Sequence, residues 1–275
     1  AKAVERVDTP AEALSVCLSE KGRVDIEYMA KLCDNTTVDD IISRSKGIIF
    51  LNPVTNNWES NDEYLSGNVK SKLKVAELYA KDDSRFLANV EALKTVQPPD
   101  LTADEIQVRL GATWLDPKYI NQFMKEVLNV GDNVTAIYTP QTAEWYIKNK
   151  NYVWGNVLVN TTYGIPEANA LHILENALNL RSMTITEKDY LLDKYVVNKE
   201  ATKNANMKQQ ELKEAFNDWI FSDITRRDEI CKVYNEKFNA TRPREYDGSH
   251  LSFIGMNPEI TLKDHQRNAV AHTLY

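Results

Sequence analysis

The sequence predicts an α+β protein that is mostly helical. In most segments of the 275-residue chain, apolar side chains recur every three or four positions, which is the period of an amphipathic helix. Several of these segments open with a Ser, Thr, Asp or Asn at the capping position. Only a short N-terminal stretch and a central stretch are rich in the β-branched and aromatic residues typical of strands. Helices should therefore form most of the molecule, with small sheets between them.

The N-terminal third opens with the signals of three short helices. Thr9-Pro10-Ala11-Glu12 is a capping box with Pro at the first helical position, and Gly22 ends the helix that it starts. Asp25 can cap a second helix. Thr37 can cap a third, which ends near Gly47.

A β-hairpin follows these helices in the prediction. Ile48-Ile49-Phe50-Leu51 is strand-like, residues 52–57 are rich in turn formers, and Trp58 with Tyr64-Leu65 supplies a returning strand. Three helices and a hairpin are the order of a winged helix, so residues 1–67 should form a winged-helix-like unit. Such a unit reads DNA through its third helix and wing, or it serves as a spacer between proteins. Asp39 and Asp40 in the third helix favour the spacer, because a groove reader would carry Arg, Lys or Asn there.

Residues 68–131 form a helical segment in this prediction. The pattern is helical from 68 to 96, and Pro98-Pro99 then breaks the chain and is the best candidate for a linker. Thr102-Ala103-Asp104-Glu105 is another capping box. Asp116-Pro117 opens a strongly amphipathic helix that Gly131 ends.

Residues 132–198 should form a small mixed sheet with at least one helix packed on it. The strand-like runs are residues 134–138, 145–147, 157–159, 182–186 and 195–197. A helix is expected from Pro166 to about Leu178. Residues 199–275 then predict a C-terminal helical stalk, in which Asp223 recaps the chain and residues 262–274 form the last helix.

The composition is that of a soluble, globular, cytoplasmic protein. Hydrophobic residues make up 43% and charged residues 27%. No run of eighteen apolar residues and no signal-peptide pattern occurs, so we expect no membrane partner. The odd number of cysteines and the absence of a Cys-x-x-Cys pair indicate reduced thiols, which we expect to be packed in the core at Cys17 and Cys33. Four scattered histidines, without a His-Glu-x-x-His motif, do not predict a metal site: His172, His250, His265 and His272.

Net charge argues against DNA binding over the whole surface, because the chain carries −7. One segment is locally basic. It has six basic and three acidic residues between positions 226 and 244. Weak, sequence-independent DNA binding is expected at these basic residues, through phosphate contacts: Arg226, Arg227, Lys232, Lys237, Arg242 and Arg244.

Aromatic residues crowd the central strand region beside two lysines. The rings are Trp145, Tyr146, Tyr152 and Trp154, and the cations are Lys148 and Lys150. Rings interleaved with cations can hold unpaired bases. Alternating aromatics on a half-buried strand also serve simply as packing residues, and we favour packing here.

The last helix carries a motif, Leu262-x-x-His265-Gln266-x-x-Ala269-Val270. It resembles the stretch that leads into the first ATP-binding loop of superfamily II helicases and Swi/Snf-type translocases. The resemblance implies that Gln266 hydrogen-bonds the adenine edge, because a side-chain amide offers one donor and one acceptor. The alternative is an ordinary exposed polar residue. No Gly-x-x-x-x-Gly-Lys-Ser/Thr loop occurs up to Tyr275, so we expect the chain to be a piece from the front of a motor.

Longer motifs resemble one family, the very large bacterial DNA methylase–helicase fusion proteins of mobile elements. The segments that carry the resemblance are 64–73, 108–114, 198–202, 216–220, Tyr234–Asn239, Arg242–Leu251, Gly255-Met256 and the Gln266 motif. In that family an adenine-N6 methylase precedes a connecting region and a Swi/Snf-like helicase. The resemblance implies that this chain is the connecting region and the start of the helicase part.

Function follows from that resemblance as an expectation. The chain should connect methylase and motor domains of one polypeptide and help to position DNA, while the parent uses ATP with Mg²⁺ and S-adenosylmethionine. The chain itself should not be an enzyme, because Asn52-Pro53-Val54 and Asn257-Pro258-Glu259 both fail the methylase motif Asn-Pro-Pro-Tyr/Phe at its third position. The alternative is a purely structural or protein-docking module without DNA contact.

Overall fold

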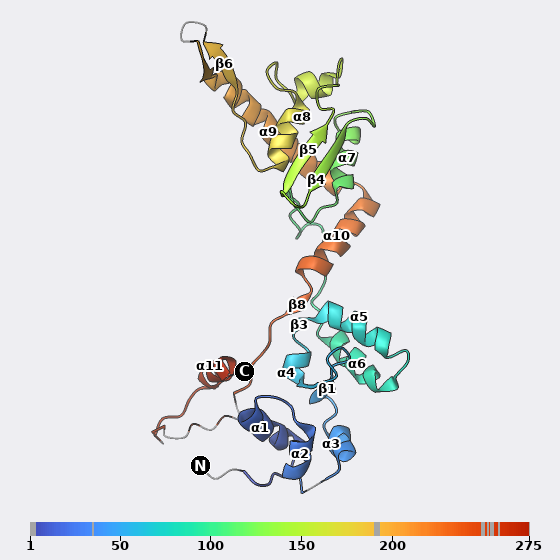
Figure 1. Ribbon diagram of the computed structural model, residues 1–275, viewed down its shortest axis with the longest axis vertical. Helices are drawn as coiled ribbons and strands as arrows, with labels where there is room; N and C mark the ends of the chain where they lie inside the picture. Colours follow the sequence, from blue (N-terminus) through green and yellow to red (C-terminus); the bar gives the residue numbers. More distant parts are fainter. Residues whose placement is uncertain are drawn as a thin grey trace. The chain divides into compact units, whose positions relative to one another are not determined.

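The computed structural model describes residues 4–34, 36–189, 193–248, 251, 253, 256–257 and 259–274 (Figure 1). The chain forms two compact units. Unit 1 comprises Ala1–Asp100 and Asn235–Tyr275, and unit 2 comprises Leu101–Tyr234. The boundaries between these units lie at other positions than those of the four segments expected from the sequence, which are 1–67, 68–131, 132–198 and 199–275. Unit 2 begins directly after Pro98-Pro99 and Asp100, next to the expected linker.

Unit 1 begins with the predicted winged helix. Its helices are α1 (Pro10–Lys21), α2 (Ile26–Leu32) and α3 (Val38–Arg44), and its wing is the antiparallel pair β1 (Ile49–Leu51) and β2 (Trp58–Ser60). The caps explain where the helices start, because the side chains of Thr9, Asp25 and Thr37 each accept a backbone N–H of the first turn. Gly22 ends α1 in the left-handed conformation, at φ 67°.

The returning strand is shorter than predicted. Tyr64 ends a one-turn helix, α4 (Asn61–Tyr64), that follows β2 directly, so the prediction of a strand at Tyr64-Leu65 is wrong. Asp62 and Glu63 lie in the first turn of α4, where negative charge is favourable. The helix carries Tyr64 inward, where its ring stacks on Phe50 with 5.2 Å between centroids.

The rest of unit 1 packs on the wing and α4. The helical pattern between 68 and 96 is confirmed as α5 (Val69–Tyr79), the 3₁₀ turn η1 (Ser84–Phe86) and α6 (Leu87–Thr95). Their apolar faces share a core with the wing, formed by Phe50, Tyr64, Leu65, Val69, Ala76, Val90 and Leu93. Strand β3 (Gly67–Asn68) pairs antiparallel with β8 (Thr241–Arg242), which brings the C-terminal segment into this unit. The last helix is α11 (Asp264–Leu274).

The core of unit 2 lies between three helices and a hairpin. Helix α7 (Pro117–Glu126), β4 (Thr135–Thr139), β5 (Glu144–Lys148) and α8 (Ala170–Leu178) surround one core with α9 (Lys199–Ile220). Along the hairpin Ala136, Trp145 and Ile147 are buried, while Ile137 and Tyr146 pair across the outer face. A second hairpin, β6 (Thr186–Asp189) and β7 (Lys194–Val197), precedes α9. Helix α10 (Ile224–Phe238) begins in unit 2 and ends in unit 1.

The expected mixed sheet is replaced by separate hairpins. In the described part of the chain every sheet has two strands, and all of them are antiparallel. Residues 157–159 do not form a strand, because the chain turns there into η2 (Leu158–Thr162), a π-helical turn. The Asn156 side chain accepts the Val159 N–H at 3.1 Å and so favours the turn.

Only half of the capping box at Thr102 forms, and no helix follows it. Thr102 N–H donates to the Glu105 side chain at 2.9 Å, and Glu105 N–H donates to the Thr102 carbonyl at 3.0 Å. The following chain is extended instead, because Ile106, Val108 and Leu110 are buried in turn while the residues between them are exposed. This period of two packs three apolar side chains into the unit 2 core. No helix in the described residues has the length and apolar character needed to span a membrane.

Candidate nucleic-acid interface

The third helix and the wing, which would contact DNA in a groove-reading winged helix, carry little positive charge. On α3 Asp39 and Asp40 are exposed, and Arg44 lies 3.8 Å from the Asp40 carboxylate. The wing loop, residues 52–57, contains no basic residue. Asn52 closes this loop, because its side chain accepts Val54 N–H at 2.9 Å and donates to Glu59 at 2.6 Å. This face therefore carries few of the cations that phosphate contacts require, Arg44 on α3 and Lys46 just after it being exposed.

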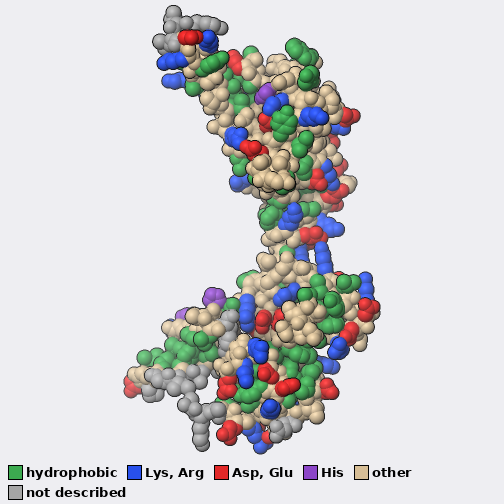
Figure 2. Space-filling view, in the orientation of Figure 1, with side chains coloured by type: hydrophobic (Ala, Val, Ile, Leu, Met, Phe, Trp, Pro, Cys, Tyr) green, Lys and Arg blue, Asp and Glu red, His purple; other side chains and the backbone are tan. Residues whose placement is uncertain are grey.

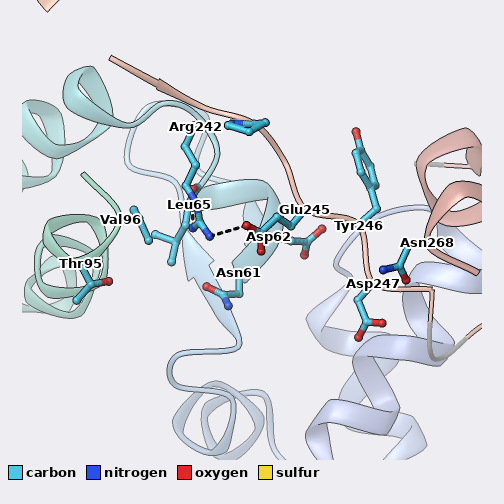
Figure 3. A pocket seen from close by; sticks show the side chains of 11 residues that line it. Asn61, Asp62, Leu65, Thr95, Val96, Arg242, Glu245, Tyr246, Asp247 and Asn268 are labelled. Carbon is cyan, nitrogen blue, oxygen red and sulfur yellow. Dashed lines mark hydrogen bonds and ion pairs between the residues drawn. The ribbon is translucent and has the colours of Figure 1, made fainter. Parts of the chain in front are cut away.

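Arg242 and Arg244, both predicted to bind DNA, hold the C-terminal segment onto α4. Arg244 donates to the Asp62 carboxylate at 3.0 Å, and its side chain is only 20% exposed. Its guanidinium lies 4.9 Å from the Tyr246 ring centroid. Arg242 donates to the Leu65 carbonyl at 3.4 Å and to Glu245 at 3.3 Å, as Figure 3 shows. These contacts give both arginines a structural role, which argues against phosphate contact.

A cavity of about 620 Å³ lies beside these arginines in unit 1 (Figure 3). It is lined by Asn61, Asp62, Leu65, Thr95, Val96, Arg242, Pro243, Glu245, Tyr246, Asp247 and Asn268. Its charged lining consists of three carboxylates and one guanidinium, so it does not favour an anionic ligand. The cavity is thus no phosphate-binding site.

Arg226, also predicted to bind DNA, is buried at 8% exposure in unit 2. Its guanidinium donates to the carbonyls of Trp219 at 2.8 Å and Ile220 at 3.0 Å, and to the Ser222 hydroxyl at 3.1 Å. It stacks 3.7 Å from the Trp219 ring centroid and lies 3.5 Å from Glu126. Arg226 therefore donates to carbonyls at the C-terminal end of α9, and its burial argues against contact with DNA.

The three remaining predicted residues lie on α10. Arg227 is half-exposed, with its Nε 3.5 Å from Asp228. Lys232 and Lys237 are exposed. Within the described residues, neither lysine forms an ion pair. The basic segment is thus divided, since Arg226, Arg227 and Lys232 belong to unit 2 and Lys237, Arg242 and Arg244 to unit 1. DNA binding by these residues stays a prediction.

Gln266, the predicted adenine-binding residue, is exposed near the start of α11. Its side-chain oxygen accepts the backbone N–H of Lys263 at 2.9 Å. This reach-back bond caps the helix start, as the third residue of a capping box does. The acceptor half of the amide is therefore occupied, and pairing with adenine requires the Gln266 side chain to rotate.

Helix α11, which confirms the helix predicted over residues 262–274, is docked on the segment before it. Gly248 N–H donates to the Asn268 side chain at 2.9 Å, and the rings of Tyr246 and His272 meet edge-on at 4.6 Å. Ala271 is fully buried, while Leu274 is 62% exposed. The apolar side chains of α11 are therefore only partly buried.

The central aromatic residues divide into one buried ring and three exposed ones. Trp145 is 4% exposed and packs in the core, as predicted. Tyr146, Tyr152 and Trp154 are exposed, so packing does not explain them. Lys150 forms an ion pair with Glu175 at 2.6 Å.

Other reactive groups are held in unreactive states. The pKa values of the Cys17, Cys33 and Cys231 thiols are raised, first of all by burial. Cys17 and Cys33 are buried, which confirms the packing prediction. The pKa of His172 is lowered by burial and then by the nearby Lys150. Among the residues that the structure describes, no three His, Cys, Asp or Glu side chains are grouped as metal ligands, and His250 lies outside those residues.

No local sequence pattern identifies the distant partners of these side chains. Asp62 and Arg244 are 182 positions apart, and Glu126 and Trp219 are 93 apart. The Arg226 contacts are local, since its carbonyl acceptors lie six and seven residues earlier. A basic residue just after a predicted helix end is the one signal that could have identified a cap.

Comparison with protein families gives two matches. Residues 6–59 match the family described as probable helicase, winged helix domain. Residues 109–240 match a family described as a domain of unknown function (DUF8437). Neither the curated proteins nor the solved structures gave a match. The first match coincides with α1–α3 and the wing, so the N-terminal part of this chain is a winged-helix region of the helicase-associated kind.

Proposed function

We propose that this chain is a non-catalytic module of a DNA helicase, which connects an adenine-N6 DNA methylase to an ATP-dependent Swi/Snf-like motor and helps to position DNA. The helicase-associated winged helix at residues 6–59 is the observation that carries the proposal. The motif around Gln266 gives further support, because it stands on a helix at the C-terminal side, where a motor would follow. The methylase and the mobile-element origin rest on the sequence resemblance alone.

The proposal assigns no chemistry to the chain itself. It lacks a P-loop to hold ATP phosphates and an Asn-Pro-Pro-Tyr/Phe motif to hold a target adenine. ATP with Mg²⁺ and S-adenosylmethionine would be bound by the neighbouring domains of the parent, in the cytoplasm. Only Gln266 would contribute to a nucleotide site, by orienting adenine.

DNA contact is proposed at Arg227, Lys232 and Lys237. In these three of the predicted basic residues, the charged group is not held in a buried or bidentate contact within the chain. Arg226, Arg242 and Arg244 are withdrawn from the interface because each ties two segments together. Two free lysines and one half-exposed arginine fit weak binding to any DNA sequence.

The acidic third helix favours a second function for the winged helix, which is docking to protein. Asp39 and Asp40 on α3 would repel DNA phosphate, and the uncharged loop 52–57 has no cation to attract it. If docking is the whole function, the chain never touches DNA.

A salt-dependent titration separates the two functions. The complete chain is titrated into fluorescently labelled duplex DNA of two unrelated sequences at several salt concentrations. Equal, weak binding to both sequences is expected. The slope of the logarithm of the binding constant against the logarithm of the salt concentration should be smaller in magnitude by about 2 in the Lys232→Ala/Lys237→Ala variant, because each phosphate contact contributes about 0.9.

The matched control is Lys81→Ala/Lys203→Ala, which removes two exposed lysines elsewhere and should leave the slope unchanged. Absence of duplex binding at the lowest salt, or equal slopes for both double variants, would support the docking function instead.

A further inference from the structure

The outer face of the unit 2 hairpin and the loop after it display three exposed aromatic rings. Tyr146 on β5 is 53% exposed, Tyr152 is 69% exposed and Trp154 is 93% exposed. Ile137, the cross-strand partner of Tyr146, is 46% exposed on the same face. Burying such side chains is favourable by about 2 kcal/mol or more each, so their joint exposure indicates a surface that binds something.

The loop that carries Tyr152 and Trp154 is anchored at several points. Val153, between them, is buried at 8% exposure. The Asn156 side chain donates to the Leu128 carbonyl at 2.8 Å, and the Asn160 side chain donates to the Val153 carbonyl at 2.9 Å. The Asn169 side chain likewise donates to the Lys150 carbonyl at 2.9 Å. The backbone thus holds the two rings outward before any ligand arrives, which lowers the entropic cost of binding.

The sequence around these rings is locally basic in a chain of net charge −7. Between Glu144 and Glu167 it has two lysines, Lys148 and Lys150, and no acidic residue. Lys150 pairs with Glu175 at 2.6 Å, and Glu144 pairs with Arg181 at 2.7 Å. Lys148 is therefore the lysine of this stretch that can contact a nucleic-acid backbone.

Cation and ring also lie close together on this face. Lys150 Nζ is 5.3 Å from the Tyr146 ring centroid. Lys148 is exposed on the same strand, two residues from Tyr146. Figure 2 shows apolar, basic and acidic side chains intermingled over the part of unit 2 that carries β5 and α8. Rings with adjacent cations match the alternation of bases and phosphates in a nucleic-acid strand.

We propose that Tyr146, Tyr152 and Trp154, with Lys148, form a binding site for single-stranded nucleic acid. The rings stack on unpaired bases and Lys148 contacts the backbone. A duplex does not fit this chemistry, because its bases are already stacked and paired. The site lies in unit 2 and uses none of the residues assigned to duplex contact, so it stands whether or not the proposed function is correct.

The test compares binding of single and double strands by the complete chain. Labelled oligothymidylate is titrated with the native chain and with the Tyr152→Ala/Trp154→Ala variant. The variant should bind the single strand about tenfold or more weakly, because each stacked base contributes about 1–3 kcal/mol. Duplex affinity should not change, which separates this site from the lysines of α10. Quenching of Trp fluorescence by the oligonucleotide should be lost with Trp154.

Two further variants sharpen the result. Tyr195→Ala removes another exposed ring of unit 2, at 73% exposure on β7, and should leave single-strand affinity unchanged. Lys148→Ala should lower the salt slope by about 0.7. Circular dichroism melting confirms that each variant is folded. If the native chain does not bind oligothymidylate, or the double ring variant binds it as tightly as the native chain, the proposal is wrong and the face belongs to a protein partner.

Discussion

Arg226 and Arg227 are neighbours with the same charge, yet their surroundings differ. Arg226 is buried against Trp219 and caps the end of α9, whereas Arg227 is half-exposed beside Asp228. A count of charges along the segment cannot make this distinction, because it records the residue type and not its acceptors. For single residues, the hydrogen bonds of the guanidinium therefore decide between a structural and a binding role.

Arg226→Ala should destabilise unit 2 by about 2–4 kcal/mol. The change removes the Arg226 donor from the Ile220 carbonyl and from the Ser222 hydroxyl, and it removes one of the donors to the Trp219 carbonyl. It also removes the stack on Trp219 and the ion pair with Glu126. Arg227→Ala is the matched control and should stay within about 0.5 kcal/mol of the native chain. Urea unfolding followed by Trp fluorescence measures both. Equal stability of the two variants would contradict the capping role.

Tyr28 makes a residue-level prediction about pH. The hydrogen bond from its hydroxyl to Glu20 raises the pKa of Tyr28 to about 12. Because the pKa is higher in the folded state than in the unfolded state, the hydrogen bond stabilises the folded state, and this stabilisation is complete below about pH 10. It is lost as the pH rises from about 10 to about 12.

The Tyr28→Phe variant checks this by comparison with the native chain. At neutral pH the variant should have a lower urea midpoint of unfolding than the native chain. Between about pH 10 and 12 the two midpoints should converge. Other groups titrate in the same range in both proteins, so only the difference is interpreted. A difference that does not change with pH would show that the Glu20 contact does not stabilise the fold.

Elements with their own local signals could be predicted from the sequence. Helices α1, α2 and α3 start after the side chains that the sequence marks as caps, and α7 starts at Pro117 after Asp116. Strands β4 and β5 are long enough for their alternation to be visible. The physical reason is that capping and period act within a few residues.

Elements decided by tertiary contacts could not be predicted. The box at Thr102 opens no helix because Ile106, Val108 and Leu110 are needed in the core with period two. Strands β3 and β8 have two residues each and pair across more than 170 positions, so no local pattern marks them. In the candidate site, the residue types were visible but the partners were not. The exposure of Tyr152 and Trp154 also depends on contacts with distant parts of the chain, such as the Leu128 carbonyl, which accepts a hydrogen bond from the Asn156 side chain.

Helix α11 gives a prediction at the scale of an element. A Cβ at Gly248 would lie 2.1 Å from the Arg267 carbonyl oxygen, which belongs to the α11 backbone. Gly248→Ala should therefore push α11 away from the Tyr246 segment and increase its hydrogen exchange. Asn268→Ala removes only the hydrogen bond to Gly248 N–H and should have a smaller effect. Native exchange rates in Gly248→Ala would argue against this docking.

At the scale of the whole molecule, the two units carry different kinds of surface. Unit 1 contains the helicase-associated winged helix, the tied C-terminal segment and Gln266. Unit 2 contains the exposed rings and their lysines. A connecting module with more than one nucleic-acid surface is consistent with this distribution. The proposed function also requires a motor domain whose adenine site would include Gln266.

A variant of Gln266 and a control variant test this part of the proposal while separating adenine binding from helix capping. Gln266→Glu keeps an oxygen that can accept Lys263 N–H, but it lacks the amide donor that pairs with adenine. Thr273→Ala changes an exposed residue of the same helix and serves as the control.

The deciding measurement is the ATP dependence of hydrolysis by a longer protein that carries this chain and the motor. The account predicts that Gln266→Glu raises the ATP concentration for half-maximal hydrolysis by about tenfold, as the loss of a paired amide contact does. Thr273→Ala should leave it unchanged, and both variants should melt as the native protein does. An unchanged ATP dependence in Gln266→Glu would contradict the assignment of α11 to the front of a helicase motor.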